Sequence, residues 1–179
     1  MFKHYRKRTL SRGANFSVAT TDDIKYMWAA YRKGSLDQEV FGDYMPDGLD
    51  PQSFGSMFEL FLLDAGLDCY IMSAHNKDGL KPVGVVLVWK RGRLMEIYRF
   101  IWFEWATKRN ILETSLNFVN QFRSTVHEPT GKKHKLIGFV EQDNISLYEH
   151  LIKYKVLRRI GKSYDFFNDS PAMVYETTK

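Results

Sequence analysis

The stretch "IWFEWATKRNILETSLNFVNQF", residues 101–122, changes from a strand pattern to a helix pattern within a few residues. Its first residues alternate in character, whereas the later apolar residues fall at helical spacing, at Leu112, Leu116, Phe118, Val119 and Phe122. Between the two patterns lies a short polar and basic turn, residues 106–110. A helix that starts directly after a strand has free backbone N–H groups, and such groups bind anions. The turn therefore predicts either an anion site or a plain structural corner.

Outward from this stretch, the apolar patterns predict a strand, two helices, three strands, a helix, a strand, a helix and two strands. The first helix is expected to follow a cap in residues 20–23 and to end at Gly34, and the second to begin at Pro51 and to end at Gly66. The strands are expected over residues 15–19, 69–73, 83–89, 95–105, 135–140, 156–160 and 172–175, the later helices over 108–125 and 143–153, and loops over 35–50 and 161–171.

The composition of the 179 residues is that of one packed domain, with 44% hydrophobic and 15% aromatic residues. The single cysteine, Cys69, excludes an internal disulfide and lies in an apolar strand pattern, so we expect it in the core rather than as a nucleophile. The five histidines lack metal-ligand spacing. Because no apolar run is long enough to span a membrane and the N-terminus lacks the core of a signal peptide, we expect a soluble protein.

The charges are divided unevenly along the chain, although the net charge is only +5. Residues 1–12 carry five basic residues and no acidic one, whereas residues 37–76 carry eight acidic residues and no Lys or Arg. The basic segment suits nucleic-acid phosphate or an acidic protein surface, including residues 37–76 of a neighbouring copy in a homo-oligomer, and the alternative is a solvated tail. The acidic segment favours a basic amine or a lysine-bearing protein as partner.

This order of elements, together with the strings WFEWATKRNILE and YKVLRRIGK, resembles the GCN5-related N-acetyltransferase (GNAT) superfamily. The chain is most similar to GNAT-like proteins encoded by tailed bacteriophages, over roughly residues 13–177. The resemblance implies an α+β domain over residues 13–179, and the charge pattern predicts a separate basic arm over residues 1–12. Its central sheet would be mixed, mostly antiparallel and twisted, with about six to seven strands and about four flanking helices.

The resemblance also implies an activity, the transfer of an acetyl group from acetyl-CoA to an amine. Family members hold the cofactor between two splayed strands and wrap its pyrophosphate with the turn that follows. Some phage relatives are virion components, so the alternative is a catalytically silent scaffold that serves as a virion component or binds a host protein. The expected location is the host cytoplasm, or the virion in the second case.

The cofactor contacts that the resemblance implies centre on the corner at residues 106–112. The Gly-x-Gly positions of the family turn fall on Asn110, Ile111 and Leu112, and the charges of Lys108 and Arg109 compensate for the missing glycines. Asn144, which begins the last helix, is either a further contact or an ordinary helix cap. The full set is Trp102, Phe103, Trp105, Ala106, Thr107, Lys108, Arg109, Asn110, Ile111, Leu112 and Asn144.

The catalytic residues that the resemblance implies are a base and an acid. Glu104 is the candidate base, and the alternative for it is a salt-bridged surface carboxylate. Glu96 would share a face with Glu104 on a regular strand, unless a bulge separates them. Leu151 stands where the family has a tyrosine that acts as general acid, so the candidate acids are the flanking residues Tyr148 and Tyr154. A further candidate base is His75.

Overall fold

The computed structural model describes residues 16–33, 48–76, 79–91, 94–125, 135–141, 145–154, 157–167 and 170–177. The predicted basic arm, most of the predicted loop 35–50 and Asn144 lie outside these ranges. The elements, in chain order, are β1 (Phe16–Val18), a 3-10 turn (Thr21–Asp23), α1 (Ile24–Arg32), α3 (Pro51–Asp64), β2 (Leu67–Asn76), β3 (Gly79–Arg91), β4 (Leu94–Trp102), α4 (Lys108–Thr125), β5 (Lys135–Glu141), α5 (Ile145–Lys153), β6 (Leu157–Phe167) and β7 (Ser170–Thr177).

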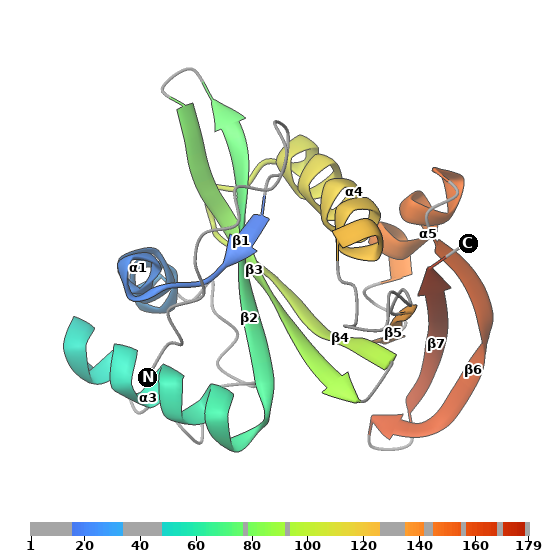
Figure 1. Ribbon diagram of the computed structural model, residues 1–179, viewed down its shortest axis with the longest axis horizontal. Coiled ribbons are helices and arrows are strands. Elements are labelled where there is room, and N and C mark those ends of the chain that lie inside the picture. Colours follow the sequence, from blue (N-terminus) through green and yellow to red (C-terminus); the bar gives the residue numbers. More distant parts are fainter. Residues whose placement is uncertain are drawn as a thin grey trace.

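The strands form one sheet in the order β1-β2-β3-β4-β5-β7-β6. Every pairing is antiparallel except that of β4 with β5, which is parallel and joins residues 94–97 to residues 135–138 only. The sheet therefore consists of two antiparallel groups connected by a short parallel seam (Figure 1). The predicted α+β class and the mostly antiparallel sheet are confirmed.

Helices cover both faces of the sheet (Figure 1). On one face α1 and α3 pack on β2 and β3, in a core that includes Met27, Phe54 and Phe58. On the other face α4 and α5 pack in a core that includes Phe118 and Leu151. Apolar side chains from both faces of β3 are buried, as its continuous apolar run predicts.

Local sequence signals explain where the first two helices begin and end. The side chain of Asp23 accepts a hydrogen bond from the backbone N–H of Thr20 (2.8 Å), and the Asp50 carboxylate accepts those of Gln52 and Ser53 at the start of α3. Gly66 has a φ of 65°, which favours glycine and ends α3 as predicted. Both helices are confirmed, whereas Gly34, the expected end of the first, lies outside the described residues.

The clearest differences from the predicted segments are one loop and the end of one strand. The loop expected over residues 161–171 is largely strand, because Lys162 and Ser163 of β6 pair with Met173 and Ala172 of β7. The strand expected to reach residue 105 ends at Trp102. The N–H of Phe103 still bonds to the carbonyl oxygen of Val83 (2.9 Å), and the chain then turns.

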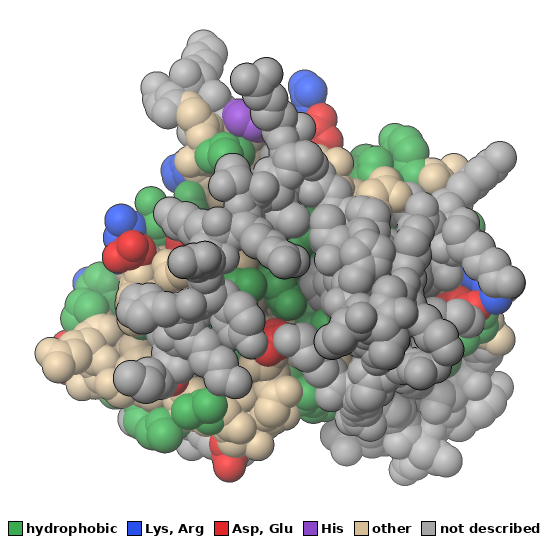
Figure 2. Space-filling model, viewed as in Figure 1, with side chains coloured by type: hydrophobic (Ala, Val, Ile, Leu, Met, Phe, Trp, Pro, Cys, Tyr) green, Lys and Arg blue, Asp and Glu red, His purple; other side chains and the backbone are tan. Residues whose placement is uncertain are grey.

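Helix α3 also carries apolar side chains on its outer face. Leu60 and Leu63 are 57% and 66% exposed, and hydrophobic surface is visible over this helix at the lower left of Figure 2. A helix with apolar side chains on both faces has a second surface that a partner can cover. None of the helices in the described ranges is both long and apolar enough to cross a membrane.

Candidate functional site

Strand β4 leaves β5 at a bulge. Arg99 lies opposite Leu87, and Ile97 lies opposite the next residue, Val88, so Tyr98 is an extra residue in β4. A bulge bends a strand and increases its twist. Within the described ranges the pairing of β4 with β5 stops at Ile97, whereas β4 itself continues to Trp102.

Aromatic side chains border this edge on the α4–α5 face. The rings of Phe100 and Trp102 are stacked, with centroids 5.7 Å apart and an interplanar angle of 8°. Phe100 also meets Phe118 of α4 and Tyr148 of α5 edge-on, at 5.9 and 6.1 Å. Both β4 aromatics are half-buried, so part of each remains available to a ligand.

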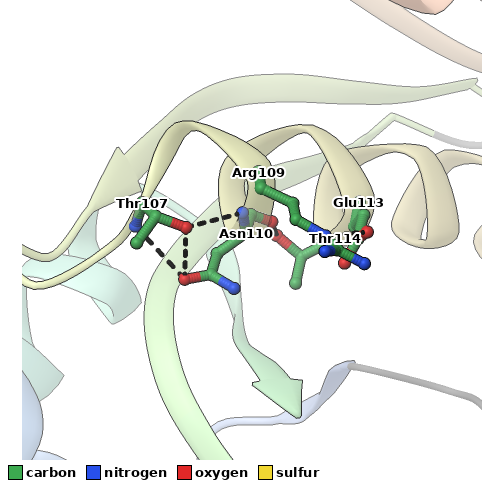
Figure 3. Close-up of polar contacts among 5 residues, drawn as sticks. All are labelled: Thr107, Arg109, Asn110, Glu113 and Thr114. Carbon is green, nitrogen blue, oxygen red and sulfur yellow. Dashed lines mark hydrogen bonds and ion pairs between the residues drawn. The ribbon is translucent and has the colours of Figure 1, made fainter. Parts of the chain in front are cut away.

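The corner after β4 is built by a reciprocal cap at the start of α4 (Figure 3). The Thr107 hydroxyl oxygen accepts the backbone N–H of Asn110 (3.1 Å), and the Asn110 side-chain oxygen accepts both the backbone N–H and the hydroxyl of Thr107 (3.2 and 2.8 Å). The backbone N–H of Ile111 bonds to the Thr107 carbonyl oxygen (3.0 Å). Asn110, a predicted cofactor contact, is therefore part of the helix cap in this structure.

The cap limits how many backbone N–H groups of the corner can reach an anion. Of the N–H groups from Lys108 to Ile111, those of Asn110 and Ile111 are used. Those of Lys108 and Arg109 have no acceptor among the described residues. The predicted anion turn is thus reduced to two backbone donors at a helix N-terminus.

The two cations of the turn differ in their surroundings. The Arg109 guanidinium is exposed and pairs with Glu113 one turn along the helix, with Nε 2.7 Å from Oε1 (Figure 3). The hydrogen bond and the negative charge of Glu113 raise the pKa of Arg109 further. Lys108 is exposed and forms no ion pair with a described carboxylate. An anion at the corner meets Lys108 directly, but it competes with Glu113 for Arg109.

Substituting Thr107 by alanine is expected to destabilise the corner by about 1 kcal/mol, which is the usual effect of losing an N-cap. The substitution removes the hydroxyl that accepts the Asn110 N–H and leaves the rest of the helix unchanged. Urea denaturation would measure the loss. Ser56→Ala is a matched control, because the exposed Ser56 hydroxyl only donates to a carbonyl oxygen within α3. Equal stabilities of the two variants would contradict the cap.

The two candidate glutamates lie in different settings. Glu104 is in the turn after β4, 56% exposed, with Oε2 3.4 Å from Nζ of Lys33. Glu96 is in β4, 3% exposed, and the bulge at Tyr98 lies between the two, so they do not share a strand face. Glu104 is thus a salt-bridged surface carboxylate beside the corner, and it can reach solvent as a base must.

The candidate acids are also placed differently. Tyr148 is 6% exposed on α5, where it packs on Phe100 and Tyr175. Burial, with a further contribution from Tyr175, raises the pKa of the Tyr148 phenol, so it stays protonated at neutral pH. Tyr154 follows α5 and is 55% exposed, and Leu151 is fully buried. Of the two tyrosines, only Tyr148 packs against the β4 aromatics.

Trp105 connects the corner to the β2–β3 hairpin, a contact that sequence reasoning did not predict. Its indole N–H donates to the carbonyl oxygen of Pro82 (2.7 Å), and Nζ of Lys81 lies 5.3 Å from the centroid of the same ring system. Trp102 packs in the core on the α4–α5 face, and Trp105 packs in the core on the α1–α3 face. The lone glycine inside the β3 apolar run, Gly84, was a signal for a close approach at this end of the sheet.

Cys69 is 5% exposed in the core of the α1–α3 face, as predicted. Burial raises the pKa of its thiol, and the negative charges of Asp23 and Asp68 raise it further. The described residues contain no group of three or more His, Cys, Asp or Glu side chains that could hold a metal ion.

The folded protein is therefore expected to react with a disulfide reagent such as DTNB at pH 8 at least about 10²-fold more slowly than the unfolded chain, because the thiolate is the reactive form. The measurement is the rate of thionitrobenzoate release with and without guanidinium chloride. One thiol should react per unfolded chain. Rapid reaction in the absence of denaturant would contradict the buried position of Cys69.

Comparison with known proteins identifies the fold. No protein-family model and no curated protein sequence matches the chain. Solved structures do match: a GNAT-family acetyltransferase from Bacillus anthracis has a TM-score of 0.57 at 16% identity, with 90% of this chain and 92% of that chain covered. A Vibrio cholerae spermidine N-acetyltransferase, in complex with CoA and spermine, has a TM-score of 0.56 at 11% identity, with 90% and 91% covered. An apo nucleotide-linked sugar GNAT has a TM-score of 0.56 at 14% identity, with 90% and 84% covered. This chain has the fold of the GNAT-family acetyltransferases.

Proposed function

We propose that this protein binds an acyl-CoA, acetyl-CoA being the typical one, and transfers the acyl group to an amine. The observation that carries the proposal is the junction at which β4 leaves β5 at Tyr98 and runs into the start of α4. The GNAT fold of this chain supports the proposal as well, because one solved structure with a similar fold is in complex with CoA.

The groups at this junction fit the cofactor. The peptide groups of β4 beyond Ile97 would pair with the pantetheine amides. The N–H groups of Lys108 and Arg109, with the Lys108 ammonium, would hold the pyrophosphate. Leu112 stands where the family has a glycine. Its side chain is half-buried in α4, so only part of it is exposed to solvent at this turn. Of the other predicted contacts, Trp102 borders the same strand edge, whereas Phe103, which is 2% exposed, and Trp105 pack in the core on the opposite face.

Acetyl-CoA, when bound, supplies an activated thioester. On this proposal Glu104 accepts a proton from the amine, directly or through a water, since its carboxylate is exposed beside the corner. Tyr148 is the better placed donor of a proton to the departing CoA thiolate, because it packs on Phe100 of β4 whereas Tyr154 is on the surface. His75, exposed near the end of β2, is the second candidate for the base.

The acceptor that we propose is a polyamine or a lysine-bearing protein. The acidic segment 37–76 has no Lys or Arg, so it favours a cationic substrate. Its described part places Asp50, Asp64 and Glu59 on or next to α3. The structural neighbour from V. cholerae is named a spermidine N-acetyltransferase, which makes spermidine and spermine the first acceptors to try.

The experiment is a turnover assay with acetyl-CoA and a panel of amines: spermidine, spermine, a lysine peptide and an amino sugar. Released CoA is followed by DTNB, and the acetylated product is identified by mass spectrometry. Product formation that depends on the protein supports the proposal. Tight CoA binding with no product from any amine would favour the second function below.

The second candidate is a catalytically silent scaffold of the GNAT fold. The buried Leu151 at the position of the acidic tyrosine favours it, because this position cannot supply a proton. Such a protein of phage type would act in the virion or on a host protein, or in a homo-oligomer through Leu60 and Leu63 of α3.

Contact with nucleic acid through residues 1–12 is a further proposal. Removal of residues 1–12 should then abolish the retention of the protein on a heparin column at moderate salt. Equal retention of the full-length and the truncated protein would exclude that role.

A further inference from the structure

The β2–β3 hairpin extends beyond its neighbours in the sheet. Its strands pair as far as Asn76 with Gly79, whereas the described part of β1 reaches only Met72, and β4 ends opposite Gly84. The outer part of the hairpin is therefore a two-stranded ribbon, visible at the top of Figure 1. A ribbon of two strands is only marginally stable by itself, so a contact that fixes it to the domain determines where its side chains lie.

Trp105 provides this contact. Its indole N–H donates to the carbonyl oxygen of Pro82 at 2.7 Å, and the ammonium of Lys81 lies 5.3 Å from the centroid of its ring system. Trp105 precedes Lys108 by three residues, and three residues span at most about 11 Å of extended chain. The contact therefore holds the Lys81 ammonium at the end of the sheet where α4 begins.

The charge of Lys81 is not neutralised by the described part of the chain. Lys33 pairs with Glu104 and Arg109 pairs with Glu113, whereas no described carboxylate forms an ion pair with Lys81. A lysine over an aromatic ring keeps its charge while the ring restricts its position. Lys81 and Lys108 are thus two exposed cations at the same end of the sheet, contributed by different elements of the fold.

We infer that Lys81, held on Trp105, is a further binding residue of the proposed acyl-CoA site and contacts a phosphate group of the cofactor. This inference rests on the proposed function. Two parts of CoA carry such a group, the pyrophosphate and the 3′-phosphate of the ribose. Because an ammonium is a compact point charge, either phosphate satisfies it, and the loss of one phosphate from the ligand distinguishes them.

The test is calorimetric titration of the full-length protein and its Lys81 variants with CoA, 3′-dephospho-CoA and pantetheine. Lys81→Ala should raise the Kd for CoA about 3- to 10-fold, and Lys81→Arg should stay within about twofold of the unaltered protein. The effect on pantetheine, which has no phosphate, should be absent. If the loss persists with 3′-dephospho-CoA, the contact is to the pyrophosphate, and if it disappears, the contact is to the 3′-phosphate.

A matched control is Lys25→Ala, because Lys25 is also exposed and lies over a tyrosine ring, 5.0 Å from the centroid of Tyr26 on α1. It should leave the Kd unchanged. If the unaltered protein binds CoA normally and the two alanine variants have equal Kd values, the role of Lys81 is wrong. The proposed function would still stand. A failure of the unaltered protein to bind CoA would instead remove the proposed function. Thermal unfolding of both variants checks that the hairpin change leaves the fold intact.

Discussion

Gly84→Ala is expected to lower the free energy of unfolding by about 2–3 kcal/mol or to prevent folding altogether. A Cβ atom at Gly84 would lie 2.5 Å from the carbonyl oxygen of Ile101 and 2.8 Å from the Trp102 ring. The carbonyl oxygen belongs to the β3–β4 backbone pairing, so it cannot move without breaking the register that leads into the corner. Urea denaturation of the soluble variant, or its loss during expression, measures the effect.

Gly55→Ala is the control for this substitution. Its Cβ would meet only the side chain of Ile24, at 2.9 Å from Cδ1, and this side chain can rotate away. Alanine is also favoured over glycine inside a helix by about 1 kcal/mol. The two effects oppose each other, so the stability should change by less than about 1 kcal/mol. A Gly84 variant as stable as the Gly55 variant would show that β3 and β4 do not approach as closely as the structure has them.

The second large effect is expected at Glu104, provided that the turnover assay finds an acceptor. Glu104→Gln removes the only ionisable group of this side chain and keeps its shape, so the acetylation rate should fall by about 10²-fold. Loss of the Lys33 pair alone is worth only about 0–1 kcal/mol, since both groups are largely exposed. The rate is measured at saturating acetyl-CoA, so that a change in cofactor affinity does not contribute.

Lys33→Met separates catalysis from the salt bridge. It breaks the same ion pair but leaves the carboxylate of Glu104 in place. If Glu104 is the base, the Lys33 variant should keep its rate within a few-fold while the Glu104 variant loses it. Small and equal changes in both variants would mean that Glu104 is a surface residue. The base would then have to be sought at His75 or in a water chain.

The sequence was sufficient for the elements that have strong periodicity and clear end signals. The helix over residues 108–125 is found as predicted, because a long amphipathic pattern follows a polar turn. The helix from Pro51 to Gly66 has a cap at one end and a glycine with positive φ at the other. For these segments local preference and tertiary packing agree.

The parts that could not be predicted depend on pairings between distant segments. The β6–β7 hairpin includes residues 161–167, which contain glycine and polar residues, because pairing with β7 outweighs weak strand preference. The end of β4 at Trp102 and the bulge at Tyr98 likewise depend on register with β3. Such contacts are not encoded in any single window of the sequence.

The candidate site likewise has features that the local sequence predicts and features that depend on contacts between side chains. The position of the corner and its two cations follows from residues 101–122 alone. That Asn110 caps the helix, that Glu113 holds Arg109 and that Lys33 pairs with Glu104 depends on side-chain geometry. The contact of Lys81 with Trp105 joins residues 24 positions apart, so sequence spacing gave no indication of it.

Isothermal titration of the full-length protein with acetyl-CoA and with CoA shows whether the junction of β4 and α4 binds the cofactor. The proposed site offers a strand edge for pantetheine and a positively charged helix start for the pyrophosphate, so both ligands should bind with a Kd below about 1 mM, which corresponds to about 4 kcal/mol. Binding should weaken as the salt concentration rises, because charges hold the phosphates. No detectable heat with either ligand at millimolar concentration would contradict acyl-CoA binding by this protein.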